Sequence, residues 1–117
     1  VKDCNVFMVD DMIATGGTIL NACRVLKDEG AKDIFIACTF PFFNGNALDK
    51  FANAYEQGII KKVIGTDAVF QGEDFIKNNE WYDEVSLAKL LSHVIYRINH
   101  KLSLSEILDS DESINRL

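Results

Sequence analysis

Two neighbouring acids and a glycine-rich turn lie close together near the start of the chain. Asp10 and Asp11 end a run of apolar residues, and Thr15 to Thr18, which reads Thr-Gly-Gly-Thr, opens a stretch of helical periodicity three residues later. Glycine lets the backbone approach an anion closely, and the first amides of a helix lie unpaired at its positive end. The pattern therefore predicts a cradle for a phosphate monoester.

The side chains around this turn are suited to binding a sugar phosphate. The hydroxyls of Thr15 and Thr18 can donate to phosphate oxygens, and the carboxylates of Asp10 and Asp11 can accept hydrogen bonds from sugar hydroxyls or help to position Mg²⁺. Taken singly, an acid pair or Gly-Gly often marks only a strand end or a turn. The combination favours a pentose phosphate, because the Gly-Lys-Ser/Thr ending of a P-loop and the dinucleotide pattern GxGxxG are both absent.

Short apolar runs alternate with longer stretches of helical period on both sides of this turn. We expect strands at 6–9, 34–38, 63–65 and near 84–85, and helices that carry Ile19 to Leu26, Leu48 to Tyr55 and Leu87 to Ile98, the last capped by Ser86. This rhythm predicts an α/β fold, in which a mainly parallel sheet is flanked by helices on both faces with right-handed crossovers. Ligands of such sheets bind beyond the strand carboxyl ends, here at 10–18, 39–46 and 66–72.

Composition limits the class of protein. The chain has 117 residues, with 12 Lys and Arg against 18 Asp and Glu, a size that predicts one compact domain over 1–117. The acidic balance without a basic cluster argues against nucleic acid as a partner, and no apolar run has the length of a membrane span. Three cysteines lack the spacing of a zinc site, and we expect them to be buried thiols: Cys4, Cys23 and Cys38. Free thiols and the absence of a membrane span together favour the cytoplasm.

The segment from Val9 to Ile19 resembles the phosphoribosyl pyrophosphate loop of the type I phosphoribosyltransferase fold, and within that fold the ribose-phosphate pyrophosphokinase family. Thr39 with the aromatic loop after it, Thr66-Asp67 and the closing helix from Val85 agree with that family. The resemblance covers nearly the whole chain. It implies that residues 1–117 are the C-terminal portion of a phosphoribosyltransferase-like domain, with the rest of that domain and an N-terminal domain lying upstream.

The family's activity implies a function for the parent protein. These enzymes use Mg²⁺ to transfer diphosphate from ATP to ribose 5-phosphate, which supplies nucleotide biosynthesis. The resemblance assigns no catalytic residue and no metal ligand here, but it implies six substrate-binding residues: Asp10, Asp11, Thr15, Gly16, Gly17 and Thr18. We expect the chain alone to be inactive, because the family's ATP contacts and basic catalytic loop lie upstream. We also expect a homo-oligomer, since a sheet edge would be exposed.

Two positions depart from the family's pattern. Ala14 stands where family loops commonly carry Asp, and Phe40-Pro41 follows Thr39 where the family often has His-Gly. Two alternatives therefore stay open, a non-catalytic regulatory homologue and a phosphoribosyltransferase that joins phosphoribosyl pyrophosphate to a base. The loss of the acid at Ala14 weakens the transferase alternative more, because that acid can serve as the base there. The aromatic loop either packs over a ligand or forms a hydrophobic lid or an assembly contact.

Overall fold

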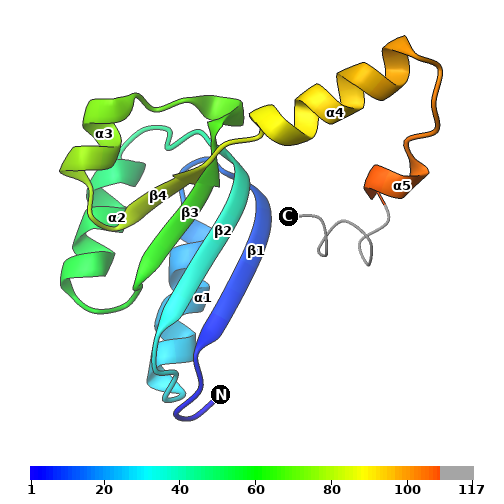
Figure 1. Cartoon of the computed structure of the whole chain (residues 1–117). Coiled ribbons are helices and arrows are strands. Elements are labelled where there is room, and N and C mark those ends of the chain that lie inside the picture. The colour runs from blue at the N-terminus through cyan, green and yellow to red at the C-terminus, as the bar shows by residue number, and fades with distance from the viewer. Residues whose placement is uncertain (109–117) are drawn as a thin grey trace. The chain divides into compact units, whose positions relative to one another are not determined.

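A computed structural model describes residues 1–108, in which four strands form one parallel sheet in the order β1-β2-β3-β4 (Figure 1). The strands are β1 (Val6–Ile13), β2 (Ile34–Pro41), β3 (Lys62–Thr66) and β4 (Tyr82–Val85). The connections contain α1 (Gly17–Asp28), α2 (Ala47–Glu56), the 3-10 turn η1 (Asp67–Val69) and α3 (Glu73–Asn78). The parallel α/β fold predicted from the sequence is confirmed.

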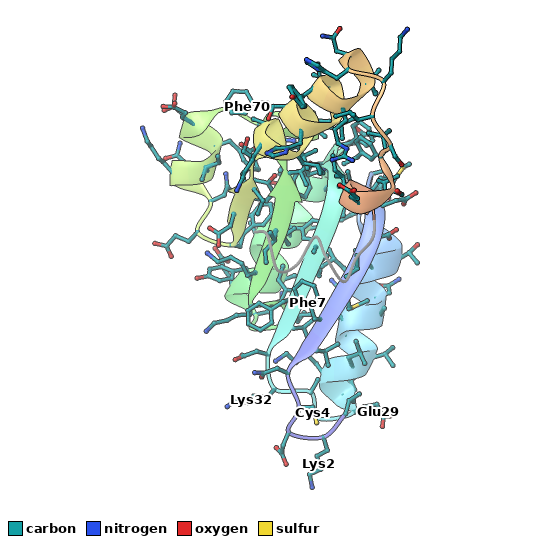
Figure 2. The ribbon with its side chains drawn as sticks, turned by 45° about the vertical axis from the view of Figure 1, so that its right-hand side comes forward. Lys2, Cys4, Phe7, Glu29, Lys32 and Phe70 are labelled. Atoms are coloured by element: carbon teal, nitrogen blue, oxygen red, sulfur yellow. The ribbon has the colours of Figure 1, made fainter. Side chains whose placement is uncertain are left out.

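The connecting helices lie on one face of this sheet. Ile34, Ile36 and Cys38 alternate along β2 and are buried beneath the helices, whereas Phe7 is 60% and Val9 74% exposed on the opposite face. Figure 2 shows Phe7 on the sheet face turned away from α1. The prediction of helices on both faces is therefore wrong for residues 1–85. Right-handed crossovers that always step to the next strand in the same direction place every helix on the same side.

The first two strands are longer than their apolar runs indicate. We expected β1 to end before Asp10 and the segment after Cys38 to be irregular, but parallel pairing continues through Met12↔Phe40 and Ile13↔Pro41. Asp10 and Asp11 therefore belong to the strand and do not follow it. Pairing with the neighbouring strand satisfies the backbone groups of these residues whatever their side-chain polarity.

Aromatic rings fill the space between the sheet and its helices. Phe43 contacts Phe51, Trp81 and Tyr82 edge to face, with ring centroids 5.4, 5.5 and 5.7 Å apart. Trp81 and Tyr82 are both buried in this aromatic core. The stripe expected on α2 differs in one position, because Leu48 is exposed.

The helix α3 was not expected from the sequence. Its six residues are too few to show a helical period, yet it brings Phe75 onto the ring of Tyr82, with the centroids 5.2 Å apart. A segment this short is held in place by what it packs against, because isolated helices of a few residues are unstable in water. Its amphipathic character therefore shows only in the folded chain.

The contacts divide the chain into two compact units after Val85, where one compact domain was expected, and the second unit begins at Ser86. It contains α4 (Ala88–Asn99) and α5 (Ser105–Leu108), which an ion pair from Arg97 to Glu106 joins at 3.0 Å. The Ser86 hydroxyl accepts a hydrogen bond from the Ala88 amide at 3.2 Å, as its expected capping role requires, although Leu87 occupies the N-cap position.

The apolar stripe predicted on the last long helix is present, but no residue of α4 is buried. The chain continues after α4 to the short helix α5, and residues 109–117 lie outside the described residues. Among the described helices, none has the length and apolarity that a membrane span would need.

Replacing Tyr82 by Phe should leave the free energy of unfolding unchanged or raise it by up to about 1 kcal/mol. The Tyr82 hydroxyl is buried and has no hydrogen-bond partner within residues 1–108, so its removal loses no interaction while the ring contacts stay. The urea midpoint measures the change. Tyr82→Ala is the control and should cost about 3–5 kcal/mol. A loss above about 1 kcal/mol in Tyr82→Phe would show that the hydroxyl has a partner.

Candidate phosphate-binding site

The turn that joins β1 to α1 is short and rests on the aromatic core. It spans Ala14 to Gly16, and Gly16 has a φ of 72°, a left-handed conformation that favours glycine. A Cβ added to Gly16 would lie 2.3 Å from Cε2 of Phe51, a fully buried ring of α2. Gly16 is therefore required both by the backbone conformation and by the ring beneath it.

The first turn of α1 presents unpaired amides next to open space. The first helical hydrogen bond runs from the Leu20 amide to the Gly16 carbonyl at 3.0 Å, so the amides of Gly17 to Ile19 precede it and have no acceptor within the helix. This first turn contains no acidic residue, and a Cβ added to Gly17 would meet no atom within 4 Å. The helix end is therefore positive, and there is open space beside the Cα of Gly17.

A neighbouring segment fixes the turn through the backbone alone. The amides of Phe42 and Phe43 both donate to the Ile13 carbonyl, at 3.0 and 3.1 Å, and the Asn44 amide donates to the Ala14 carbonyl at 2.8 Å. None of these bonds involves the side chain at position 14. The geometry of the turn is therefore compatible with Ala14, where the resembling family commonly has Asp.

The two predicted acids lie on the strand that leads into the turn. Asp10 and Asp11 are both exposed, and successive residues of a strand point to opposite faces. The Asp10 carboxylate accepts a hydrogen bond from the Asp11 amide at 2.8 Å, which holds one of its oxygens close to the backbone. Asp10 and Asp11 therefore cannot act as a facing carboxylate pair unless a ligand reaches both sides of β1.

The three segments expected at the carboxyl end of the sheet do meet. A hollow of about 200 Å³ has Asp10, Thr39 and Thr66 among its polar lining residues. The Thr66 hydroxyl donates to the Thr39 carbonyl at 2.7 Å and accepts from the Ala68 amide at 3.1 Å. The predicted phosphate-binding turn follows Asp10 along the chain and consists of Thr15, Gly16, Gly17 and Thr18. Both of its threonines are exposed. The structure thus brings an acid of β1 and hydroxyl side chains of β2 and β3 together around this hollow, whose lining does not include Thr15 to Thr18.

The thiols near the site are chemically quiet. Burial, with a smaller contribution from the charge of Asp10, raises the pKa of Cys38 from 9.0 to about 11. Burial likewise raises the pKa of Cys23 to about 11. Both thiols therefore stay protonated at neutral pH and are poor nucleophiles. The expectation of buried thiols holds for these two cysteines but is wrong for Cys4, which is exposed.

The described residues do not contain three His, Cys, Asp or Glu side chains arranged to hold a metal ion. Mg²⁺ commonly binds through one or two carboxylates, with water and substrate phosphate oxygens completing its coordination. Because Asp10 and Asp11 point to opposite faces of β1, only one of the two carboxylates at a time could contribute to such an ion, and ligand oxygens and water would have to complete its coordination.

Sequence reasoning predicts candidate ligand-binding residues of the site but not the residues that support them. Phe51 was expected only as a core residue of the second helix, and no local signal connects it with Gly16, 35 positions earlier. The carbonyl of Ile13 and the amide of Asn44 are backbone groups, which sequence patterns do not distinguish. The support of the turn becomes visible only once the two segments lie side by side.

A parallel α/β sheet with a glycine-rich strand-to-helix turn at its carboxyl edge defines the class of sugar-phosphate and nucleotide-binding α/β domains. Residues 2–109 match the family described as the phosphoribosyl synthetase-associated domain, and the chain belongs to this family.

The chain is also similar in sequence and structure to individual named proteins. The chain is 36% identical over 110 residues to a ribose-phosphate pyrophosphokinase of Chlorobaculum tepidum, and 33% identical over 113 residues to ribose-phosphate pyrophosphokinase 1 of Streptococcus pneumoniae. These alignments cover 94% and 97% of the chain but 32% and 33% of the relatives. The crystal structure of phosphoribosylpyrophosphate synthetase from Mycobacterium smegmatis matches with a TM-score of 0.75 and 33% identity, over 86% of this chain and 32% of that one. The chain thus spans about a third of the length of these relatives.

The adjacent glycines of the turn should respond differently to alanine. Gly16→Ala should lower the free energy of unfolding by roughly 2–4 kcal/mol, because it adds a strained left-handed residue and a clash with Phe51. Gly17→Ala is the matched control and should leave it unchanged or raise it by up to about 1 kcal/mol, because its Cβ meets open space within a helix. Urea unfolding of both variants measures the difference. Equal losses would contradict the packing of the turn on Phe51.

Proposed function

We propose that the chain binds the 5-phosphate of ribose 5-phosphate at the amino end of α1. The observation that supports this most directly is the set of amides from Gly17 to Ile19, which have no acceptor within α1 and lie in a first helical turn without an acid. The exposed hydroxyls of Thr15 and Thr18 flank these amides and add donors. Phosphate carries the charge that a helix end of this kind favours.

In the same proposal, Asp10 and Asp11 accept hydrogen bonds from the ribose hydroxyls. They precede the turn on β1, so a sugar attached to a phosphate at Gly17 extends back towards them. Mg²⁺ bound there would neutralise phosphate charge on an acidic protein, and one carboxylate, of Asp10 or of Asp11, would hold it together with ligand oxygens. The chain's own contribution is to position the sugar and exclude wrong orientations.

For the full-length parent, the named relatives support the activity of a ribose-phosphate diphosphokinase acting on ATP and ribose 5-phosphate in nucleotide biosynthesis. Transfer of this kind needs mainly positioning and charge neutralisation, and no nucleophilic side chain. The chain spans about a third of such relatives, and its buried thiols stay protonated. We therefore assign it the binding of the sugar phosphate and expect it to be catalytically silent by itself.

A non-catalytic regulatory homologue is the second candidate, and Ala14 is the observation that favours it. The turn keeps its backbone geometry with Ala14 because its supporting hydrogen bonds come from Ile13 and Ala14 carbonyls. Loss of an acid next to the sugar therefore removes a carboxylate that could take part in the reaction, while the backbone of the proposed phosphate cradle stays in place. We also infer that the exposed edge of β1 pairs with a second copy in a homo-oligomer, because an unpaired edge strand is a template for association.

Ribose 5-phosphate binding should depend on Thr18 and Asp10 in distinguishable ways. Thr18→Val removes a hydroxyl donor to a charged group and should weaken binding of both inorganic phosphate and ribose 5-phosphate by on the order of tenfold. Asp10→Asn should weaken ribose 5-phosphate alone, because the acid contacts the sugar. Phosphorus NMR titrations measure both affinities.

Thr18→Ser keeps the hydroxyl and should bind like the unchanged chain, which controls for the side-chain replacement. Binding that is indifferent to Thr18→Val would place the phosphate elsewhere. An equal loss of both ligands in Asp10→Asn would exclude a specific contact with the sugar.

Turnover by the isolated chain is a separate test. Incubation of the 117-residue chain with Mg-ATP and ribose 5-phosphate should give no diphosphorylated sugar in the phosphorus spectrum. The full-length parent under the same conditions is the positive control and should form it. Product from the chain alone at an enzymatic rate would contradict its assignment as a binding portion, whereas binding without product by the parent would favour the regulatory candidate.

A further inference from the structure

The segment that connects β2 to α2 contains a chemically labile pair of residues (Figure 1). Asn44 is followed directly by Gly45, and this is the only Asn-Gly pair in the sequence. Both residues are exposed. An asparagine side chain can be attacked by the backbone nitrogen of the next residue, and glycine hinders this attack least because it has no Cβ. The function proposed above gives this pair no role.

The reacting groups of Asn44 and Gly45 are not engaged in other interactions. Within residues 1–108, neither the side-chain amide of Asn44 nor the backbone amide of Gly45 makes a hydrogen bond. A Cβ added to Gly45 would meet no atom within 4 Å, so the space beside the pair is open. In the described part of the chain, no hydrogen bond therefore has to break before the Gly45 nitrogen attacks the side-chain carbonyl carbon of Asn44.

The turn requires glycine after Asn44. Gly45 has a φ of 63°, a left-handed conformation in which other residues are strained. The Asn44 carbonyl accepts a hydrogen bond from the Ala47 amide at 3.2 Å, which closes the turn onto the first residue of α2. A substitution that removes the labile pair without straining this turn therefore has to be made at Asn44.

We propose that Asn44 is a site of spontaneous deamidation. The Gly45 nitrogen forms a bond to the side-chain carbonyl carbon of Asn44 and gives up its proton, while the bond from that carbon to the side-chain nitrogen breaks and ammonia leaves with the proton. Water then opens the cyclic imide at either of its two carbonyl carbons, which gives aspartate or isoaspartate. Each product carries one negative charge more than asparagine, and the reaction needs no cofactor.

The isoaspartate product lengthens the main chain by one carbon atom between two fixed residues. Phe43 and Ala47 are buried on either side of the pair, and the Asn44 amide donates to the Ala14 carbonyl at 2.8 Å. The longer segment has to bulge or draw one of the two buried residues out of the core. We therefore expect the isoaspartate form to be less stable than the unmodified chain, whether or not the chain binds a sugar phosphate.

Peptide mapping by mass spectrometry, after incubation of the 117-residue chain in neutral buffer, tests the site. Asn46 is the internal control, because it is exposed in the same segment but precedes Ala47, which is buried and whose amide is hydrogen-bonded. Asn44 should deamidate at least about tenfold faster than Asn46, since that hydrogen bond has to break before the Ala47 nitrogen can attack. Unfolding in urea should raise the rate at Asn46 and leave the rate at Asn44 nearly unchanged. Equal rates in the folded chain, or a rate at Asn44 that rises in urea as much as that at Asn46, would overturn the proposal.

Two variants separate the reaction from its effect on stability. Asn44→Gln keeps a side-chain amide but has to close a larger ring, so it should stay unmodified during the same incubation. Asn44→Asp carries the charge of the product on a normal backbone and should keep the urea midpoint of the unmodified chain, whereas the purified isoaspartate form should unfold at lower urea than both. Products from Asn44→Gln at the rate of the unchanged chain would overturn the site. An isoaspartate form as stable as Asn44→Asp would contradict the strain ascribed to the longer main chain.

Discussion

The contact between Gly16 and Phe51 is the constraint on which the candidate site depends. It places the ring of α2 directly beneath the turn, where even a Cβ would lie 2.3 Å from the ring. Phe51 is in turn fixed by Phe43 and Trp81, so the position of the phosphate cradle is set by the aromatic core. A loop held in this way needs no ligand to order it, which lowers the entropic cost of binding. The packing of the aromatic core therefore fixes the position of the candidate site.

The pairing of β1 with β2, which continues to the end of both strands, positions the other residues at the carboxyl end of the sheet. It carries Asp10 and Asp11 on a strand and directs their side chains to opposite faces. The same pairing brings Phe40 to Met12, and the hydrogen bonds beyond it hold Asn44 against Ala14. Buried Cys38 and buried Pro41 are three residues apart, so the in-out alternation of β2 shifts between them. That shift turns Phe40 and Phe42 outward while Pro41 and Phe43 stay buried.

The sequence predicts those parts of the fold that depend on local patterns. Strands, helices and the turn from Thr15 to Thr18 follow from apolar runs, periodicity and glycine, and all are present. The contact between Thr39 and Thr66 also follows from the sequence, because the carboxyl ends of parallel strands lie at the same edge of a sheet. The one-sided helix layer could not be predicted, since it depends on strand order. The true ends of β1 and the support of Gly16 by Phe51 depend on partners distant in sequence, which no local pattern encodes.

The turn between β1 and α1 is supported by backbone groups, so its geometry depends little on the side chains that would act on a ligand. Its supporting bonds use the carbonyls of Ile13 and Ala14 and the amides of Phe42, Phe43 and Asn44, which almost any side chain leaves in place. Substitution at Ala14 or Phe40 can therefore alter which ligand is held, or whether it reacts, while the phosphate contact persists. Glycine is the exception, because Gly16 alone meets both a left-handed φ and a ring below it. Side chains around this turn can accordingly vary while the backbone geometry of the turn is retained.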